Sequence, residues 1–169
     1  SLFAAYTDGL LVLDPGVRRH LSAQHYGDEL RDPAAKYGPP DGRLYLARAD
    51  GQAVGCIALR RLDGDRCEMK RLYVRPEYRG RGIAGQLIRR ITEDARQLGC
   101  RHLLLDTLPA LEDAVRLYRK LGFYEIPCYN DSPPEATLFF QLDLQLPPHG
   151  TTQQNLTKRG GLMAYFFPE

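Results

Sequence analysis

The segment from Arg75 to Ala84 has the residue types that bind phosphate groups. It reads Arg-Pro-Glu-Tyr-Arg-Gly-Arg-Gly-Ile-Ala, with Gly80 and Gly82 interleaved with Arg79 and Arg81. Glycine lets the backbone approach a ligand closely, and the start of a helix presents unpaired N–H groups and a positive dipole end to an anion. The segment therefore predicts either a phosphate cradle or an ordinary strand-to-helix connection that binds nothing. It is not a P-loop, because no Gly-Lys-Ser/Thr follows.

Positive charge is concentrated on and just before this segment. The cations of this short stretch are Lys70, Arg71, Arg75, Arg79 and Arg81. Such a run is either a solvated basic surface or an anion-binding site, and composition alone favours neither reading.

A strand before this loop and a helix after it must position it. Turn residues at Asp50-Gly51 and Asp63-Gly64-Asp65 separate three predicted strands, at 43–49, 52–61 and 66–74, which form an antiparallel meander. Beyond them the apolar residues follow the spacing of an amphipathic helix. They are Ala84, Leu87, Ile88, Ile91, Ala95 and Leu98, and Gly99 ends the helix.

The remaining pattern predicts a single α/β domain over residues 1–146. A strand at 102–106, a helix around 114–121 and strands at 123–129 and 136–144 follow the first helix. Strands that alternate with helices after a meander indicate a mixed sheet flanked by helices. Residues 2–12 are predicted to end a helix. The tail at 147–169 is predicted to be loose, with an added strand at 162–167.

Composition narrows the class of protein. The chain has 169 residues, 43% hydrophobic and 26% charged, and a net charge of +2, so nothing in it requires a nucleic-acid partner. No apolar run approaches the roughly 20 residues of a membrane span, and no secretory signal opens the chain. The cysteines, which are Cys56, Cys67, Cys100 and Cys128, are scattered. We therefore expect reduced, buried thiols in a cytoplasmic protein, with no metal site and no disulfide.

Two motifs in register give the chain a family resemblance. Arg79-x-x-Gly82-x-Ala84 resembles the Gln/Arg-x-x-Gly-x-Gly/Ala signature of the GNAT family of N-acetyltransferases. Downstream, the run from Ala114 to Phe123 (Ala-x-x-Leu-Tyr-x-x-Leu-Gly-Phe) resembles that family's fourth helix and the strand after it. A helix and a strand separate the two motifs, as the family requires, and the resemblance covers about residues 44–144.

The resemblance implies a mostly antiparallel sheet whose central strands splay apart around acetyl-CoA, the acetyl donor, with no metal. Backbone groups of Leu72 and Val74 would bind the pantetheine arm, and the Leu72 amide would polarise the acetyl carbonyl. Backbone N–H groups from Arg79 to Ala84 would hold the pyrophosphate. The implied cofactor-binding residues are Leu72, Tyr73, Val74, Arg79, Gly80, Arg81, Gly82, Ile83 and Ala84.

The resemblance also implies two catalytic residues. Tyr118 would protonate the departing thiolate, or else it is a core tyrosine of an amphipathic helix. Glu68, eleven residues before Arg79, would remove a proton from the attacking amine, because an ammonium has no lone pair. The competing reading is a strand glutamate that pairs with an arginine or contacts substrate. Asp106 is the reserve base. Lys70 and Arg71 would either bind a substrate carboxylate or be solvated.

The sequence departs from the family pattern at two places. Many members have an asparagine where this chain has Leu111, so that contact with the cofactor is in doubt. We also expect the chain to begin inside the family's first helix, without the strand that precedes it. Either this sequence is incomplete at this end, or residues 162–167 replace that strand.

Three functions agree with these observations. The first is acetylation of a small amine or amino acid, and the second is acetylation of a protein lysine or N-terminus. The third is a non-catalytic acyl-CoA sensor, which needs neither Glu68 nor Tyr118. We expect a small-molecule acceptor and no membrane partner, and the sequence leaves a homodimer open.

Overall fold

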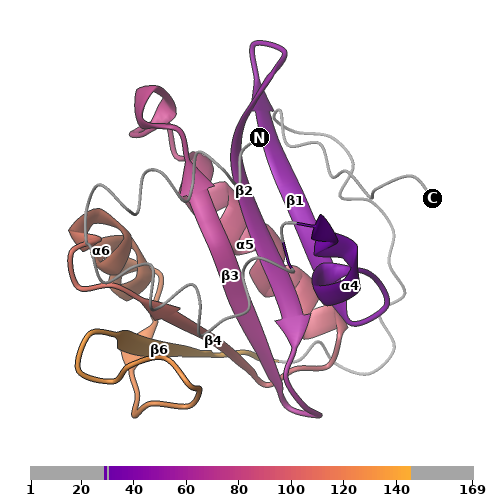
Figure 1. Ribbon diagram of the computed structural model, residues 1–169, viewed down its shortest axis with the longest axis vertical. Coiled ribbons are helices and arrows are strands. Elements are labelled where there is room, and N and C mark those ends of the chain that lie inside the picture. Colours follow the sequence, from indigo (N-terminus) through magenta and orange to yellow (C-terminus); the bar gives the residue numbers. More distant parts are fainter. Residues whose placement is uncertain (1–28, 30, 146–169) are drawn as a thin grey trace.

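The computed structural model describes residue 29 and residues 31–145, which form a six-stranded mixed sheet with helices on both of its faces (Figure 1). The strands are β1 (Gly42–Ala49), β2 (Gln52–Arg61), β3 (Arg66–Val74), β4 (His102–Thr107), β5 (Tyr124–Glu125) and β6 (Leu138–Asp143). Their order across the sheet is β1-β2-β3-β4-β6-β5. The β3–β4 pair is parallel and the other neighbouring pairs are antiparallel. The predicted fold class, a mostly antiparallel mixed sheet flanked by helices, is confirmed.

The turns of the meander form where the sequence supplies residues that suit them. Asp50 and Gly51 have φ angles of 52° and 75°, the left-handed pair of values that a tight hairpin between twisted strands requires. In the next turn, the Asp63 carboxylate accepts hydrogen bonds from the amides of Asp65 and Arg66, at 3.0 and 2.9 Å. The strands therefore begin and end beside the predicted turn residues.

Residue 29 and residues 31–145 include four helical segments beside the sheet. They are α4 (Pro33–Tyr37), a 3-10 turn η1 (Pro76–Tyr78), α5 (Ile83–Gln97) and α6 (Glu112–Lys120). The apolar stripe of α5, with Leu87, Ile88 and Ile91 almost fully buried, packs against β1, β2 and β3. Helix α4 lies over β1 and β2 on the opposite face (Figure 1). The core therefore lies between the sheet and α5.

The central strands splay, as the resemblance implied. Strands β3 and β4 are paired only from Arg66↔His102 to Glu68↔Leu104, although β3 continues to Val74 and β4 to Thr107. In Figure 1 the two strands diverge from their paired ends. The backbone on the facing edges beyond Glu68 is therefore not joined by a β3–β4 ladder.

Some predicted elements differ from the structure or lie outside it. The strand predicted at 123–129 is much shorter, Tyr124–Glu125, and the one predicted at 136–144 is Leu138–Asp143. Strand β5 ends at Glu125, although the Ile126 amide still donates to the Phe139 carbonyl of β6 at 2.9 Å. The helix end at 2–12 and the strand at 162–167 lie outside the described residues.

The expectation of reduced, buried thiols is wrong for Cys67 and Cys100, which are oxidised, and for Cys128, which is exposed. Cys67 on β3 and Cys100, just before β4, form a disulfide, whereas Cys56 is a buried thiol and Cys128 an exposed one. The two partners are 33 residues apart in sequence. No local spacing predicts their contact, because the α5 crossover brings them together.

This pairing predicts a simple thiol count. Denatured without reductant, the protein should react with two equivalents of a thiol reagent, and after reduction with four, the number of cysteines in the sequence. In the native state Cys128 should react first, because burial protects Cys56. Four equivalents from freshly purified, unreduced and denatured protein would contradict the disulfide.

Candidate active site

A cleft of about 900 Å³ opens where β3 and β4 diverge. Its walls come from the later part of β3, the end of β4, the loop that leads into α5, and α6. All the predicted cofactor-binding residues line it except Arg81, and Tyr118 lines it as well. The structure therefore brings together the two motifs that the sequence singled out.

The glycine loop presents an open helix start to this cleft. Gly80 and Gly82 both have φ 76°, a left-handed conformation that residues with a Cβ adopt reluctantly. Gly82 is the N-cap of α5 and offers no side-chain cap to its first amides. Nothing lies within 4 Å of the Cβ position at either glycine. An uncapped helix N-terminus with free space before it is a site for an anionic group.

The two arginines of the loop have different surroundings. Arg79 donates from Nε to the Val74 carbonyl at 3.0 Å, which ties the loop to the end of β3. The Arg81 guanidinium lies over the Tyr78 ring, 4.7 Å from its centroid. Both keep their positive charge beside the open end of α5, where it adds to the helix dipole.

A bulge in β3 changes which face its side chains occupy. Cys56 pairs with Tyr73 and Ala58 with Lys70, so Arg71 and Leu72 both lie opposite one residue of β2. Arg71 takes the left-handed φ of 58°, a conformation that glycine takes in the first position of a G1 bulge. Cys67 and Met69 belong to the core that α5 covers, and after the bulge Leu72 and Val74 pack against it. Lys70 and Arg71 are thereby both directed to the opposite face.

Tyr118 is both a core residue and a residue of the cleft wall. Tyr118 is 5% exposed. The centroid of its ring lies 5.8 Å from that of Phe123 and 6.1 Å from that of Phe140. Tyr118 therefore packs in the core and also lines the cleft, and the choice between a catalytic acid and a core tyrosine stays a prediction. Leu111, which replaces the asparagine of many family members, is the N-cap of α6 and also lines the cleft.

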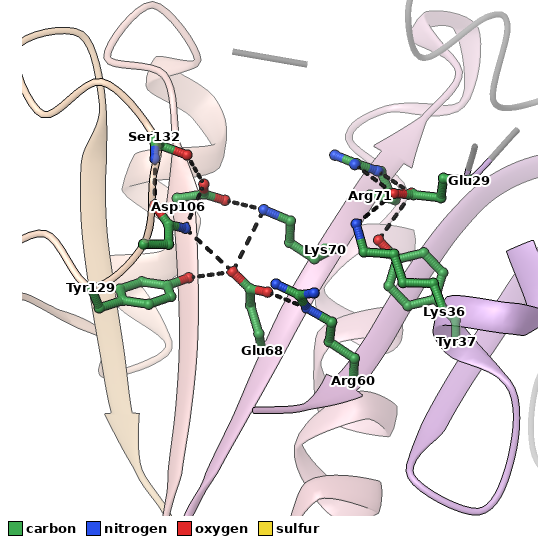
Figure 2. A network of polar contacts seen from close by, with 11 residues as sticks. Glu29, Lys36, Tyr37, Arg60, Glu68, Lys70, Arg71, Asp106, Tyr129 and Ser132 are labelled. Atoms are coloured by element: carbon green, nitrogen blue, oxygen red, sulfur yellow. Dashed lines mark hydrogen bonds and ion pairs between the residues drawn. The ribbon is translucent and has the colours of Figure 1, made fainter. Parts of the chain in front are cut away.

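Glu68 lies on the face of the sheet away from α5 and is 0% exposed (Figure 2). Its Oε2 accepts from Arg60 Nε at 2.6 Å. Its Oε1 accepts from the Tyr129 hydroxyl at 2.8 Å and from Asn130 Nδ2 at 3.5 Å, and it lies 3.6 Å from Lys70 Nζ. The predicted arginine pair is therefore present, and Glu68 stands behind the cleft wall instead of lining it.

Asp106, the reserve base, does line the cleft. It accepts from Lys70 Nζ at 2.7 Å, from Asn130 Nδ2 at 3.0 Å and from Ser132 Oγ at 2.7 Å. The side chains of Lys70 and Asp106 are 3% and 2% exposed. This ion pair joins β3 to β4 just beyond the point where their backbone pairing ends.

A second cluster on the same face surrounds Glu29 (Figure 2). Its carboxylate accepts two hydrogen bonds from Arg71, at 2.5 and 2.8 Å, and one each from Lys36 and Tyr37, both at 2.9 Å. Burial would raise the pKa of Glu29, but the hydrogen bonds and charges of Arg71 and Lys36 outweigh it and hold that pKa below its usual value. The solvated-surface reading is therefore wrong for Lys70 and Arg71, which are buried and ion-paired.

The sequence did not identify four of the residues around Glu68 and Asp106. Arg60 comes from β2, and Tyr129, Asn130 and Ser132 come from the connection between β5 and β6. The sequence placed Tyr129 at the end of the predicted strand 123–129, and it placed Asn130 and Ser132 in the turn that follows. Its contacts with Glu68 span 61 and 62 residues, beyond the reach of any local pattern.

Within the described part of the chain, no group of three or more His, Cys, Asp or Glu side chains is placed to hold a metal ion. No helix of that part has the length and apolar character needed to cross a bilayer.

Comparison with known proteins agrees with this architecture. The model of the acetyltransferase (GNAT) family matches residues 14–123. An uncharacterized N-acetyltransferase of Schizosaccharomyces pombe is 41% identical over 126 residues, which are 73% of this chain and 77% of that protein. This chain therefore belongs to the acetyltransferase (GNAT) family and is an acyltransferase.

Solved structures show the same fold at lower identity. An acetyltransferase from Streptococcus agalactiae is 22% identical with a TM-score of 0.64, over 82% of this chain and 92% of that one. A GNAT family acetyltransferase from Elizabethkingia anophelis, solved with acetyl-CoA bound, is 21% identical with a TM-score of 0.54, over 80% and 88% of the two chains.

Proposed function

We propose that this chain transfers the acetyl group of acetyl-CoA to a primary amine by direct attack within a ternary complex. The observation that carries the proposal is the uncapped start of α5, with its two open glycines, at the mouth of a cleft between splayed strands. Such a helix start suits a pyrophosphate. The cleft between β3 and β4 has a volume of about 900 Å³, and Leu72 and Val74 line it, where an extended arm would lie.

Four groups divide the chemistry in this proposal. Amides from Arg79 to Ala84 bind the pyrophosphate, and the Leu72 amide donates to the thioester carbonyl as negative charge develops there. Glu68 takes the proton from the acceptor ammonium, so that the amine gains a lone pair for attack. Tyr118 donates its proton to the departing sulfur, since a phenol and a thiol have comparable pKa values.

We further propose that the acceptor is a small amine or an amino acid. The carboxylates on the acceptor side are enclosed, with the Glu68 and Asp106 side chains 0% and 2% exposed. A compact acceptor fits such a site more readily than a folded protein surface does.

The first test is calorimetric titration with acetyl-CoA of the wild type, Gly82→Trp and a matched control, Gly64→Trp. An indole at position 82 would occupy the space before α5 and would also strain a φ of 76°, so we expect the Kd to rise at least about tenfold. Gly64 also has open space around it but no left-handed φ, and it lies outside the cleft lining. Its variant should bind like the wild type.

Absence of binding by folded wild-type protein would overturn the proposed function. Where binding is found, release of thiol from acetyl-CoA with the twenty amino acids and with common polyamines identifies the acceptor. Tight binding without turnover of any amine would favour the non-catalytic sensor instead.

A further inference from the structure

Glu68 has no direct route to an acceptor in the cleft. Glu68 is 0% exposed and does not line the cleft. Both of its oxygens already accept hydrogen bonds, Oε2 from Arg60 and Oε1 from Tyr129 and Asn130. A proton that reaches Glu68 must therefore pass through one of the groups that surround it.

Among the described residues, the partners of Glu68 are Arg60, Lys70, Tyr129 and Asn130 (Figure 2). The guanidinium of Arg60 stays protonated, and the amide nitrogen of Asn130 accepts no proton. Lys70 Nζ lies 3.6 Å from Glu68 and donates instead to Asp106 at 2.7 Å. A phenol both donates and accepts. On this geometry we propose that the Tyr129 hydroxyl relays the proton from the acceptor amine to Glu68, a role that rests on the proposed function.

The surroundings of Tyr129 suit a fixed relay. Its ring packs edge-on against Phe139, with centroids 5.6 Å apart. The next residues fasten the loop to β4, because Asn130 and Ser132 both donate to Asp106 Oδ2, at 3.0 and 2.7 Å. Glu68 is fully buried, whereas Tyr129 is partly exposed. The hydroxyl lies 2.8 Å from Glu68 Oε1. Tyr129, like Glu68, is absent from the cleft lining, so the relay requires the acceptor amine to reach this hydroxyl from the partly exposed side of Tyr129.

Tyr129 also stays in the protonation state that a relay needs. Burial raises the pKa of Tyr129 above its usual value, and the negative charges of Glu68 and Asp106 raise it further. The phenol is therefore neutral throughout the working range of pH and always has a proton to pass on.

The transfer moves one proton across each of two hydrogen bonds. An N–H bond of the acceptor ammonium breaks as a new O–H bond forms on Tyr129 Oη, while the original Tyr129 O–H breaks and its proton binds Glu68 Oε1. The nitrogen keeps the electron pair with which it attacks the thioester. After the product leaves, the same two steps in reverse return the proton from Glu68 to solvent, and Tyr129 ends unchanged.

The test is Tyr129→Phe, with Tyr124→Phe as the matched control on the same hairpin. Tyr124 is 44% exposed and donates to Asp143, away from Glu68. With the best amino acid or polyamine from the acceptor screen, we expect kcat of Tyr129→Phe to fall about 100-fold at neutral pH. The Kd for acetyl-CoA should stay unchanged in both variants, and kcat of Tyr124→Phe should match the wild type.

Two further readouts separate a relay from a packing role. The loss in Tyr129→Phe should shrink as the pH rises above the pKa of the acceptor amine, because the amine is then already neutral. The double variant Glu68→Gln/Tyr129→Phe should be no slower than the slower single variant, since both act on one proton path.

Three results would overturn the relay: a kcat of Tyr129→Phe within twofold of the wild type, a loss that is the same at every pH, or multiplicative losses in the double variant. The proposed function would instead be overturned if the wild-type protein bound no acetyl-CoA or acetylated no amine. The relay would then be excluded as well, because it depends on that function.

Discussion

We expect Glu68→Gln to lower kcat by about 100- to 10,000-fold with the Kd for acetyl-CoA nearly unchanged. Glutamine has the shape of glutamate and keeps an oxygen for the Tyr129 hydroxyl, but it cannot take up a proton at neutral pH. The acceptor then has to lose its proton to bulk water before it enters the site. Stopped-flow or steady-state measurement of thiol release, alongside calorimetry, separates the two constants.

The matched control is Glu93→Gln on α5. Glu93 is a partly exposed glutamate that contacts Arg96 and Gln97, so the same chemical change there should leave kcat and Kd at wild-type values. Circular dichroism at each temperature of the assay tests whether the Glu68→Gln variant is folded. A folded Glu68→Gln variant with wild-type kcat would transfer the base role to Asp106, which lines the cleft.

The strand boundaries of the meander could be predicted from the sequence, because turn residues mark them. Strands β2 and β3 have the predicted bounds, 52–61 and 66–74. Asp-Gly pairs lie on both sides of β2 and before β3, and Arg75-Pro76 follows β3. The bulge at Arg71 had a signal that the sequence analysis did not use. Strict alternation from Cys67 and Met69 would place Arg71 on the core face, and an arginine there indicates a break in the alternation.

The polar clusters around Glu68 and Glu29 could not be predicted from the sequence, because the residues that meet in them are far apart in the chain. Arg71 and Glu29 are 42 residues apart, and Lys70 and Asp106 are 36 apart. Periodicity reports which face of a strand is apolar, and it carries no information about which charges meet across that face. The resemblance to a family singled out Glu68 and Tyr118, but it did not supply the side chains that surround Glu68 on this acceptor face.

The Lys70–Asp106 pair compensates for the backbone pairing that the splay removes. Beyond Glu68↔Leu104, β3 and β4 are not paired as a ladder, and this ion pair joins them at 2.7 Å. With Glu68 and Arg60 it forms a cluster of two carboxylates and two cations, so its formal charges balance. Removal of one of these four charged side chains leaves an uncompensated charge that is buried away from water.

We therefore expect Asp106→Ala to lower the free energy of unfolding by about 3–5 kcal/mol. Lys70 would keep only the more distant Glu68, at 3.6 Å, as an ion partner among the described residues. Asn130 and Ser132 would lose the acceptor that fastens their loop. Urea denaturation followed by fluorescence or circular dichroism measures the change.

The double variant Lys70→Met/Asp106→Leu tests whether charge imbalance is the cause. It removes one charge of each sign and leaves Glu68 paired with Arg60, so it should recover a large part of the stability that Asp106→Ala loses. Glu125→Ala is the control, because its pair with Arg119 is about half exposed and should contribute less than about 1 kcal/mol. If Asp106→Ala destabilises the chain no more than Glu125→Ala does, the ion pair does not hold the two strands together. If the double variant is the least stable of all, specific hydrogen bonds rather than balanced charge stabilise the splayed sheet.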